Sequence, residues 1–356
     1  MSNILVINTG STSIKFKLFD LEEKELLAGC LEHVEDYDTA LKKLLRQVVN
    51  FGEIVAVGHR IVHGGDVFFE PTILNDKIIS ELEKLNHLAP LHNPYNLAGV
   101  RAATSFLPEV PQIAVFDTAF FKDLPDYART YALPKKIIEQ YKIFRFGFHG
   151  TSHEYAMIKV ADELGVKTNK LNMISCHLGG GASIAAIKNG QAVDISSGYT
   201  PNEGLVMMSR TGDLDSGIIF QLLKKIEGVD DDAKSDYLYK ILNNESGIKG
   251  LTGGIDDFKE LIKQVSLGNR DANLAFEVFI YKIIKYIGSY WAVLGGKVDA
   301  ISFTGAIGAG HPLTRETIMR KLKFLCKINH LTIAPNEELM IAKKIKNWLK
   351  NDKKNN

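Results

Sequence analysis

At 356 residues, with 45% hydrophobic and 24% charged residues, the chain is long enough to bury a sizeable core and favours two domains over one. The formal net charge is +1, because 43 Lys and Arg balance 42 Asp and Glu, which excludes the overall basic charge typical of nucleic-acid-binding proteins. Three scattered cysteines, Cys30, Cys176 and Cys326, form no C-x-x-C pair and favour a reducing cytoplasm over a disulfide scaffold.

The first apolar run of the chain stops at Asn8 and lacks the basic lead and cleavage site of a signal peptide, so we expect a buried strand there. No stretch approaches the roughly 20 apolar residues that span a bilayer, which predicts a soluble protein. Residues 4–20 combine an apolar run, a turn rich in Gly, Ser and Thr, and an alternating segment, a pattern that predicts a β-hairpin.

Residues 173–190 repeat this hairpin pattern about half a chain later. We therefore favour a duplicated domain, each copy forming one wall of a cleft, over the alternative of two unrelated hairpins. Residues 300–310 form a third strand followed by a glycine-rich turn, and that turn leads into an expected helix.

Helical and strand patterns alternate between these segments, which predicts an α/β architecture. We expect the chain to cross between domains after Phe121, and the basic last helix to pack with its lysines in solvent. The expected helices are 36–51, 136–144, 312–325 and 337–351, with a strand in 111–120; the expected domains are 1–123 with 338–356, and 124–337.

Two glycine-containing turns are candidates for phosphate binding. The turn from Asn8 to Ser13, followed by Lys15, offers backbone N–H groups that suit an anion, although a plain hairpin turn is the alternative. The second turn follows His177 and contains three consecutive glycines, 179–181, which permit close approach of a ligand to the backbone. No Walker A or G-x-G-x-x-G sequence is present, so a nucleotide would be bound by a different loop design.

Isolated charges lie beside these glycine-rich segments. Arg60 and Arg210 each present a planar fork that matches a carboxylate or a phosphoryl group, with a structural ion pair as the alternative. Asp117 closes a predicted strand, where a carboxylate usually faces a cleft. It would hold magnesium through water, orient an arginine, or simply cap the strand.

Histidines gather in turns that contain Gly, Pro or Asn. The pairs His59/His63 and His149/His153 have the i,i+4 spacing of a zinc helix, but they lack the Glu of H-E-x-x-H and adjoin glycines. A histidine that donates to a transferring phosphoryl group fits better, and buried structural histidines are the alternative.

Glycine turns, arginines and neutral donors are what phosphoryl transfer to a carboxylate requires. The carboxylate is already ionised at neutral pH, so no general base is needed, and the site must supply positive charge and geometry. The sequence therefore predicts an enzyme that moves a phosphoryl group between a nucleotide and a very small acid.

Nine stretches of the chain, in order, resemble the acetate kinase family of the acetate and sugar kinase, heat-shock 70 and actin superfamily. They cover nearly the whole chain, to about Ala342: INTGSTSIKF, GHRIVHGG, LAPLHNPYNLAG, AVFDTAF, RFGFHGTSHEYA, HLGGGASIAAIKNG, GYTPNEGLVMMSRTGDLD, FTGAIG and PNEELMIA.

The resemblance implies an α/β, duplicated actin-like (ribonuclease H-like) two-domain fold with an interdomain cleft. It also implies a cytoplasmic, homodimeric enzyme that uses Mg²⁺ and ATP to make acetyl phosphate from acetate, reversibly. The alternatives are a propionate or butyrate kinase, since a pocket distinguishes one methylene by only about 1–3 kcal/mol, and a non-catalytic actin-like nucleotide-binding regulator.

The resemblance further implies roles for particular residues. The catalytic group is Asp117, His149 and Arg210, although we assign Asp117 to positioning rather than to the family's role of catalytic acid. The acid would be bound by Arg60, with its methyl group against Val62, Leu91, Phe148 and Pro201, and the metal by Asn8 and Glu337. The nucleotide would contact Lys15, His177, Leu178, Gly179, Gly180, Gly181, Asp257, Phe258, Lys259, Ala306, Ile307, Gly308, Ala309 and Gly310.

The chain departs from the family pattern mainly on the nucleotide side. Gly180 replaces a usual Asn, residues 306–310 replace G-I-G-E-N, and Lys259 replaces an Arg that would stack and fork. Phe121 replaces a frequent His, and the chain is shorter between Lys15 and Arg60. GTP or pyrophosphate are therefore alternative phosphoryl donors.

Overall fold

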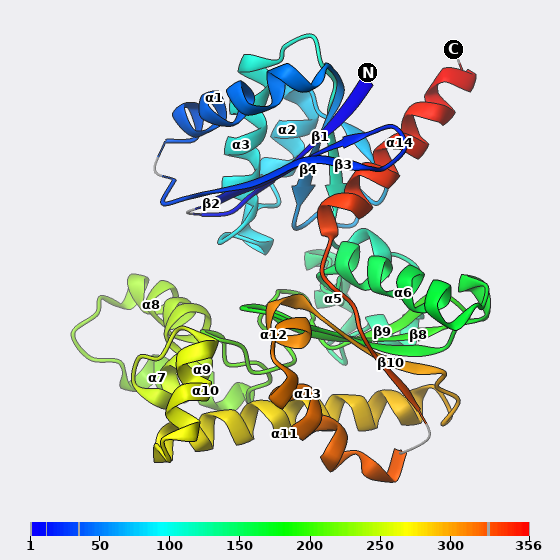
Figure 1. The fold of residues 1–356 in the computed structure, drawn as a ribbon. Helices are drawn as coiled ribbons and strands as arrows, with labels where there is room; N and C mark the ends of the chain where they lie inside the picture. Colours follow the sequence, from blue (N-terminus) through cyan, green and yellow to red (C-terminus); the bar gives the residue numbers. More distant parts are fainter. Residues whose placement is uncertain (1, 12, 35, 326–327, 356) are drawn as a thin grey trace. The chain divides into compact units, whose positions relative to one another are not determined.

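The computed structural model describes residues 2–11, 13–34, 36–325 and 328–355 (Figure 1). The chain divides into two compact units. Residues 148–155, which the sequence-based boundaries leave in the second domain, fall in the first unit. Unit 1 comprises Met1–Lys122, Phe148–Tyr155 and Asn336–Asn356, and unit 2 comprises Asp123–Gly147 and Ala156–Pro335.

Unit 1 is built on a sheet in the order β3-β2-β1-β4-β6-β5. Strands β1 and β2 form the predicted antiparallel hairpin, and β1, β4 and β6 run parallel to one another. The elements are β1 (Ser2–Thr9), β2 (Ser13–Asp20), β3 (Glu25–Glu32), α1 (Tyr37–Val48), β4 (Glu53–Ile61), β5 (Thr72–Ile73), α2 (Asp76–Glu83), α3 (Asn93–Phe106), β6 (Gln112–Phe116) and α14 (Glu337–Asn355), with 3₁₀ turns at Val49–Phe51, Asn86–Leu88 and Ala119–Phe121.

Both faces of this sheet are covered, which explains why β1 reads as a continuous apolar run. Leu5 and Ile7 share a buried cluster with residues of α1 and α3, whereas Ile4 and Val6 share another with α14. Gly58 of β4 lies under α14, since a Cβ there would come within 2.3 Å of Cδ1 of Ile345. The glycine thus permits the close approach of helix and strand.

Unit 2 contains the predicted second hairpin, β7–β8, in a sheet of order β11-β10-β7-β8-β9. Helix α6 begins in unit 1 and continues in unit 2. The elements are α4 (Asp126–Arg129), α5 (Lys135–Tyr141), α6 (Gly150–Leu164), β7 (Met173–Leu178), β8 (Ala182–Lys188), β9 (Gln191–Ile195), α7 (Ser216–Lys225), α8 (Lys234–Lys240), α9 (Gly247–Thr252), α10 (Phe258–Ser266), α11 (Arg270–Val293), β10 (Ala300–Thr304), α12 (Gly305–Gly310), α13 (Pro312–Lys321) and β11 (Asn329–Thr332), with short 3₁₀ or π turns at Thr168–Lys170, Asp231–Ala233, Ile241–Glu245 and Lys323–Leu325.

Five strands of each sheet share one arrangement, and β5 adds an antiparallel edge strand to the first sheet. In each, three consecutive antiparallel strands (β1–β3 and β7–β9) are extended by strands parallel to the first of them, β4 and β6 in one and β10 and β11 in the other. This correspondence supports the predicted duplication, because unrelated hairpins would not be followed by the same parallel extension.

One local prediction was wrong. The glycines of residues 305–310 form the short helix α12 rather than a turn. Gly305 has φ of +80°, and a Cβ there would lie 2.5 Å from the carbonyl oxygen of Leu178, so only glycine fits the entry to α12. Thr12 and Cys326 lie outside the described residues; of the other cysteines, Cys30 is exposed and Cys176 is buried. Among the described helices, none has a window apolar enough to cross a membrane.

Candidate active site

Three neighbouring parallel strands of unit 1 end at one edge of the sheet, and each brings a polar side chain to that edge. Asn8 lies near the end of β1, Arg60 near the end of β4, and Asp117 directly after β6. Arg60 Nε donates to Asp117 Oδ2 at 2.8 Å, Nη2 contacts the same oxygen, and Nη1 donates to Asn8 Oδ1 at 3.4 Å. The structure therefore brings these three predicted site residues together.

The Asp117 carboxylate is buried, with 1% of its side chain exposed, and both of its oxygens have partners. Oδ2 accepts from Arg60, and Oδ1 accepts from Thr151 Oγ1 at 2.5 Å. Its main chain is also fixed, because Gly150 N donates to Asp117 O at 2.9 Å. Among the roles that the sequence left open for Asp117, this geometry matches orientation of an arginine.

Arg60 stays a cation in this setting. Burial alone would lower the pKa of Arg60, but the Asp117 carboxylate outweighs burial and raises that pKa, and Glu337 and Glu338 act in the same direction. Both glutamates belong to the first turn of α14. The predicted metal ligand Glu337 is thus close enough to act on the charge of Arg60.

Asn8 and Lys15 occupy directly opposed positions of the β1–β2 hairpin. Opposed residues in an antiparallel pair project to the same face, so the predicted metal ligand and the predicted phosphate contact lie side by side. The turn between them is closed by Gly10 N, which donates to Ser13 O at 2.7 Å, and Tyr37 Oη donates to Gly10 O at 2.8 Å.

A small buried apolar cluster lies on the same unit. It joins the predicted Val62 and Phe148 to Ala89, which the sequence analysis did not assign, while the predicted Leu91 is half-buried. His63 contacts the Phe148 ring edge-on at 5.4 Å between ring centroids. Val62, Ala89 and Phe148 thus form a small apolar group that begins just after β4.

Two asparagines of α3 were missed by the sequence analysis, although both lie in the LAPLHNPYNLAG stretch. Asn96 Oδ1 accepts from Val62 N at 3.1 Å, and Asn96 Nδ2 donates to Thr9 O at 2.6 Å. Asn93 makes two similar bonds to the main chain of His63. Both asparagines are buried and fasten the ends of β1 and β4 to α3.

His149 has an unusual backbone conformation, with φ of +59°. A non-glycine residue in the left-handed region is uncommon, and such strain often marks functional positions. Its carbonyl oxygen accepts from Ser152 N and His153 N, both at 3.0 Å, so His149 begins α6. The sequence-predicted phosphoryl contact is therefore held rigidly by the helix that follows it.

The remaining predicted residues belong to unit 2. Arg210 Nη1 donates to Pro201 O at 3.4 Å and contacts Met207 Sδ at 3.8 Å, so the predicted Arg210 and Pro201 are neighbours. Burial lowers the pKa of Arg210, and Tyr239 opposes this shift. Because arginine titrates so far above neutral pH, the guanidinium remains charged.

Two of the glycine-rich segments of unit 2 lie next to each other. The triple-glycine turn follows β7, and Gly179 N donates to Gly181 O at 2.9 Å. A Cβ on Gly179 would lie 3.9 Å from the backbone N of Ala306, at the start of α12, and nothing lies within 4 Å of such an atom on Gly180. The turn thus leaves room for a ligand beside the first turn of α12.

The predicted residues 257–259 adjoin the end of the same helix. Phe258 packs edge-on against His311, which directly follows α12, at 5.0 Å between ring centroids. Burial lowers the pKa of His311, Lys259 lowers it further, and Asp257 raises it. All the predicted nucleotide contacts of unit 2 therefore gather around α12, whereas Lys15 belongs to unit 1.

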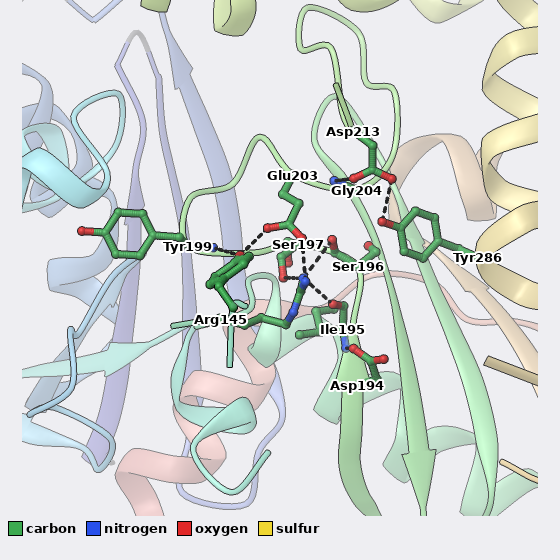
Figure 2. Close-up of polar contacts among 11 residues, drawn as sticks. Arg145, Asp194, Ile195, Ser196, Ser197, Tyr199, Glu203, Gly204, Asp213 and Tyr286 are labelled. Atoms are coloured by element: carbon green, nitrogen blue, oxygen red, sulfur yellow. Dashed lines mark hydrogen bonds and ion pairs between the residues drawn. The ribbon is translucent and has the colours of Figure 1, made fainter. Parts of the chain in front are cut away.

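A partly buried polar cluster was also missed. In unit 2, Arg145 and Tyr131 both contact Glu203, on the loop that carries Pro201 and Arg210. Figure 2 shows the Arg145–Glu203 pair. Arg145 and Glu203 both lie in stretches that resemble family motifs. The two residues are 58 positions apart in sequence, however, so no local spacing links them.

Comparisons with known proteins identify the family. A family model described as the acetokinase family matches residues 31–343. The chain belongs to the acetokinase family. Its sequence is 40% identical to "Acetate kinase" of Thermotoga maritima, with 96% of this chain and 98% of that protein covered, and 40% identical to "Acetate kinase" of Dictyoglomus thermophilum, with 96% and 97% covered.

Solved structures agree with this membership of the acetokinase family. The Porphyromonas gingivalis acetate kinase superimposes with a TM-score of 0.87 at 34% identity, covering 98% of this chain and 100% of that one. A propionate kinase from Francisella tularensis gives 0.88 at 34% identity, covering 97% and 99%. The predicted family and the predicted α/β, duplicated actin-like fold class are confirmed.

Proposed function

We propose that the protein is an acetate kinase, which transfers a phosphoryl group reversibly from ATP to acetate and yields acetyl phosphate and ADP. The observation that carries the proposal is the Arg60–Asp117 pair on the unit that also holds the apolar cluster of Val62, Ala89 and Phe148. A fixed guanidinium suits the carboxylate of a small acid, and a small apolar surface suits its methyl group.

The acid needs orientation rather than activation. Acetate is ionised at neutral pH, so its oxygen attacks phosphorus without a general base. Both oxygens of Asp117 are engaged by Arg60 and Thr151, which supports a positioning role for this carboxylate. We assign Arg60 to the acid carboxylate, and Val62, Leu91, Phe148 and Pro201 to its alkyl group.

Charge on the transferring phosphoryl group would be stabilised by His149 and Arg210. The transition state spreads negative charge over three oxygens, so a preorganised donor and a cation aimed at it lower the barrier. The strained backbone of His149 and the partly buried contacts of Arg210 with Pro201 and Met207 support these assignments, because both limit the reorganisation required during the reaction.

The donor set of unit 1 fits Mg²⁺. The Asn8 amide oxygen and the Glu337 carboxylate are hard oxygen ligands, and protein-bound Mg²⁺ commonly takes one or two carboxylates, with waters and phosphates completing its shell. When bound, the ion would neutralise phosphate charge. Asn8 Oδ1 accepts a long 3.4 Å bond from Arg60 Nη1, and an amide oxygen has a second lone pair, which suits an ion or its water.

For the nucleotide we propose the residues around α12 together with Lys15 of unit 1. The open space beside Gly180 and the adjacency of Gly179, Ala306 and Phe258 support a site there. Backbone N–H groups of a glycine turn suit phosphates. Gly179 N is already bonded to Gly181 O, so the turn would offer the N–H groups of Gly180 and Gly181.

We also propose a cytoplasmic homodimer. Helix α7 is apolar in composition yet buries none of its residues, with Ile218 43% and Phe220 62% exposed, and on α11 Leu274 and Tyr281 are exposed as well. Exposed apolar groups gathered on one unit suit a partner subunit. Sedimentation of the purified protein tests the dimer.

The function is tested by an activity matrix on the purified protein. Acetate, propionate and butyrate are combined with ATP, GTP and pyrophosphate, and acyl phosphate is trapped as the hydroxamate. We expect acetate with ATP to give the highest kcat/KM. A higher value with propionate would favour the function named for the Francisella tularensis relative, and no acyl phosphate with any pair would reject the kinase in favour of a nucleotide-binding regulator.

A further inference from the structure

Arg210 lies on a long segment of unit 2 that contains neither helix nor strand. This segment, residues 196–213, connects β9 to the residues just before α7, and we call it the Arg210 loop. Pro201 lies on the same loop. A segment without regular hydrogen bonding needs other contacts if it is to hold an arginine in a fixed place.

The part of the loop that carries Arg210 is closed where its two ends meet. We call this closure, formed by Glu203, Gly204 and Asp213, the neck of the loop. Gly204 N donates to Asp213 Oδ1 at 2.9 Å, and Asp213 N donates to Gly204 O at 3.0 Å. Asp213 Oδ2 in turn accepts from Tyr286 Oη of α11 at 2.8 Å (Figure 2). One end of the neck is therefore fixed to the longest helix of the unit.

The other end of the neck is fixed through Glu203. Its Oε1 accepts from Arg145 Nη2 at 2.5 Å, and its Oε2 accepts from Tyr131 Oη. Both donors come from the segment between α4 and β7, far from the loop in sequence. Figure 2 shows the Glu203 carboxylate next to the Arg145 guanidinium.

Arg145 and Tyr131 also hold the start of the loop. Arg145 Nη1 donates to Ile195 O at 3.0 Å and to Ser197 O at 2.9 Å, and Tyr131 Oη accepts from Tyr199 N at 2.8 Å. The same two side chains thus connect the first residues of the Arg210 loop to its neck. Every one of these bonds involves a partner more than 49 residues away in sequence.

The packing leaves this cluster little freedom. A Cβ on Gly198 would lie 1.7 Å from Glu203 Oε2 and 2.3 Å from Tyr131 Oη, so only glycine fits between them. Burial, and then the Glu203 charge, raises the pKa of Tyr131, so its hydroxyl remains a donor. For Arg145, burial acts in the opposite direction, but Glu203 outweighs it and raises the pKa.

Arg145 has a second connection, along the chain. Arg145 N donates to Arg129 O at 2.8 Å, and Phe146 N donates to Gly198 O at 3.1 Å. Phe148 follows two residues after Phe146, and His149 comes directly after it. The cluster therefore fixes the segment leading to one proposed phosphoryl contact and the loop that bears the other.

We propose that Tyr131, Arg145 and Glu203 are positioning residues, which act on phosphoryl transfer by holding the Arg210 loop in its reactive place. The proposal rests on the role proposed above for Arg210. None of the three needs to touch substrate, because the contacts described end on the loop itself. Their loss should therefore lower kcat more than it raises the KM of the acid, because the proposed carboxylate contact Arg60 belongs to unit 1 and of the proposed acid contacts only Pro201 lies on the loop.

The test is a double-mutant cycle between Tyr131→Phe and Arg210→Ala. Tyr131→Phe keeps the ring and removes only the hydroxyl that joins Glu203 to Tyr199. We expect kcat to fall by about 10-fold, since small misplacement of a catalytic group has effects up to about 100-fold, with the acid KM within about two-fold. In the Arg210→Ala background the same substitution should have almost no further effect, because the group that it positions is already absent.

A matched control separates positioning from general stability. Tyr290 is buried in the same unit and hydrogen-bonds to Asp194 of β9. Tyr290→Phe should lower the melting temperature at least as much as Tyr131→Phe does and leave kcat near the wild-type value. Glu203→Gln, which keeps size and loses charge, provides a second variant and should behave as Tyr131→Phe does.

The outcomes are distinct. An equal loss of kcat from Tyr131→Phe in the wild-type and Arg210→Ala backgrounds would overturn the proposal, as would wild-type kcat in both Tyr131→Phe and Glu203→Gln. Wild-type kcat in Arg210→Ala alone would instead reject the role of Arg210, and absence of acyl phosphate formation by the wild type would reject the proposed function.

Discussion

The side chain of Asn93 holds both main-chain polar groups of His63: Oδ1 accepts from His63 N and Nδ2 donates to His63 O, each at 3.0 Å. This amide takes the place of a neighbouring strand just beyond β4, where Arg60 and the proposed alkyl contact Val62 lie. A side chain that replaces a strand can fix a loop as rigidly as the sheet itself.

Asn93→Ala should therefore weaken binding of the acid as well as stability. Two buried hydrogen bonds are lost, and leaving buried polar groups without partners costs about 1–3 kcal/mol each. We expect a lower free energy of unfolding in urea and a raised KM for acetate. Asn75→Ala is the control: it removes the cap of α2, worth about 1 kcal/mol, and should leave KM unchanged. Equal KM values in both variants would restrict Asn93 to a folding role.

Arg60→Ala tests the carboxylate contact. Charged hydrogen bonds contribute about 1.5–3 kcal/mol, so the KM for acetate should rise by about 10- to 100-fold. The unfolding free energy should also fall, because the buried Asp117 loses its cation. Arg101→Ala, which breaks an exposed ion pair with Glu83, is the matched control. An unchanged acetate KM in a folded Arg60→Ala protein would contradict carboxylate binding there.

Arg210→Ala tests stabilisation of the phosphoryl group. Removal of a preorganised charge or donor typically lowers turnover by about 100-fold or more, and we expect that loss in kcat with smaller changes in the KM values. Arg320→Ala at the exposed end of α13 serves as control. Near-normal turnover in Arg210→Ala would refute the role.

The sequence predicts the elements that depend on local pattern. The alternation at Ile14, Phe16 and Leu18 predicts the first hairpin correctly, because these three side chains all lie in one buried cluster. For residues 305–310 the sequence pattern predicts a glycine-rich turn, but tertiary contacts stabilise a helix. Arg315 Nη1 donates to the carbonyls of Gly308 and Ala309 at 2.8 and 2.7 Å, at the last turn of α12.

The site residues divide in the same way into those that a local sequence signal identifies and those that it does not. Arg60 and Asp117 could be selected from sequence, because an isolated charge among apolar and glycine residues is a local signal. Asn93 and Tyr131 could not be selected from sequence. Asn93 acts on a residue 30 positions away and Tyr131 on one 72 positions away, and no spacing rule joins either pair. Side chains that position others are defined by the fold, and only the structure reveals them.

His59 should make the protein sensitive to mild acid. Burial, partly offset by its bond to Gln112 at 2.7 Å, lowers the pKa of His59 to about 4, against an ordinary value of 6.5. The unfolded chain therefore binds the proton more tightly than the folded one between these pH values. The stabilisation is complete above pH 6.5 and is lost as the pH falls towards 4, with a total of about 3 kcal/mol at 1.36 kcal/mol per pKa unit.

Urea unfolding measured from pH 7.5 down to pH 4.5 checks this expectation. His59→Gln should flatten the pH dependence, whereas His87→Gln, at an exposed histidine, should keep the wild-type slope. Parallel curves for His59→Gln and the wild type would show that another group governs the acid response.

Gly150→Ala should disturb the main chain of Asp117, which supports the Arg60–Asp117 pair. A Cβ on Gly150 would lie 2.1 Å from the main-chain oxygen of Asp117 and 2.9 Å from Phe120 Cβ, and Gly150 N donates to that same oxygen. Overpacking of this kind costs about 1–3 kcal/mol. Because the clash is with backbone, Asp117 must move, and the KM for acetate should rise together with the loss of stability.

Gly288→Ala is the matched control, because a Cβ there meets nothing within 4 Å and the residue lies inside α11. Alanine in a helix interior is favoured over glycine by about 0.5–1 kcal/mol, so this variant should be more stable and should keep the wild-type KM. If Gly150→Ala matched it in both measurements, α6 would be able to shift without moving Asp117, and the fixed geometry that we infer for Arg60 would not depend on the start of that helix.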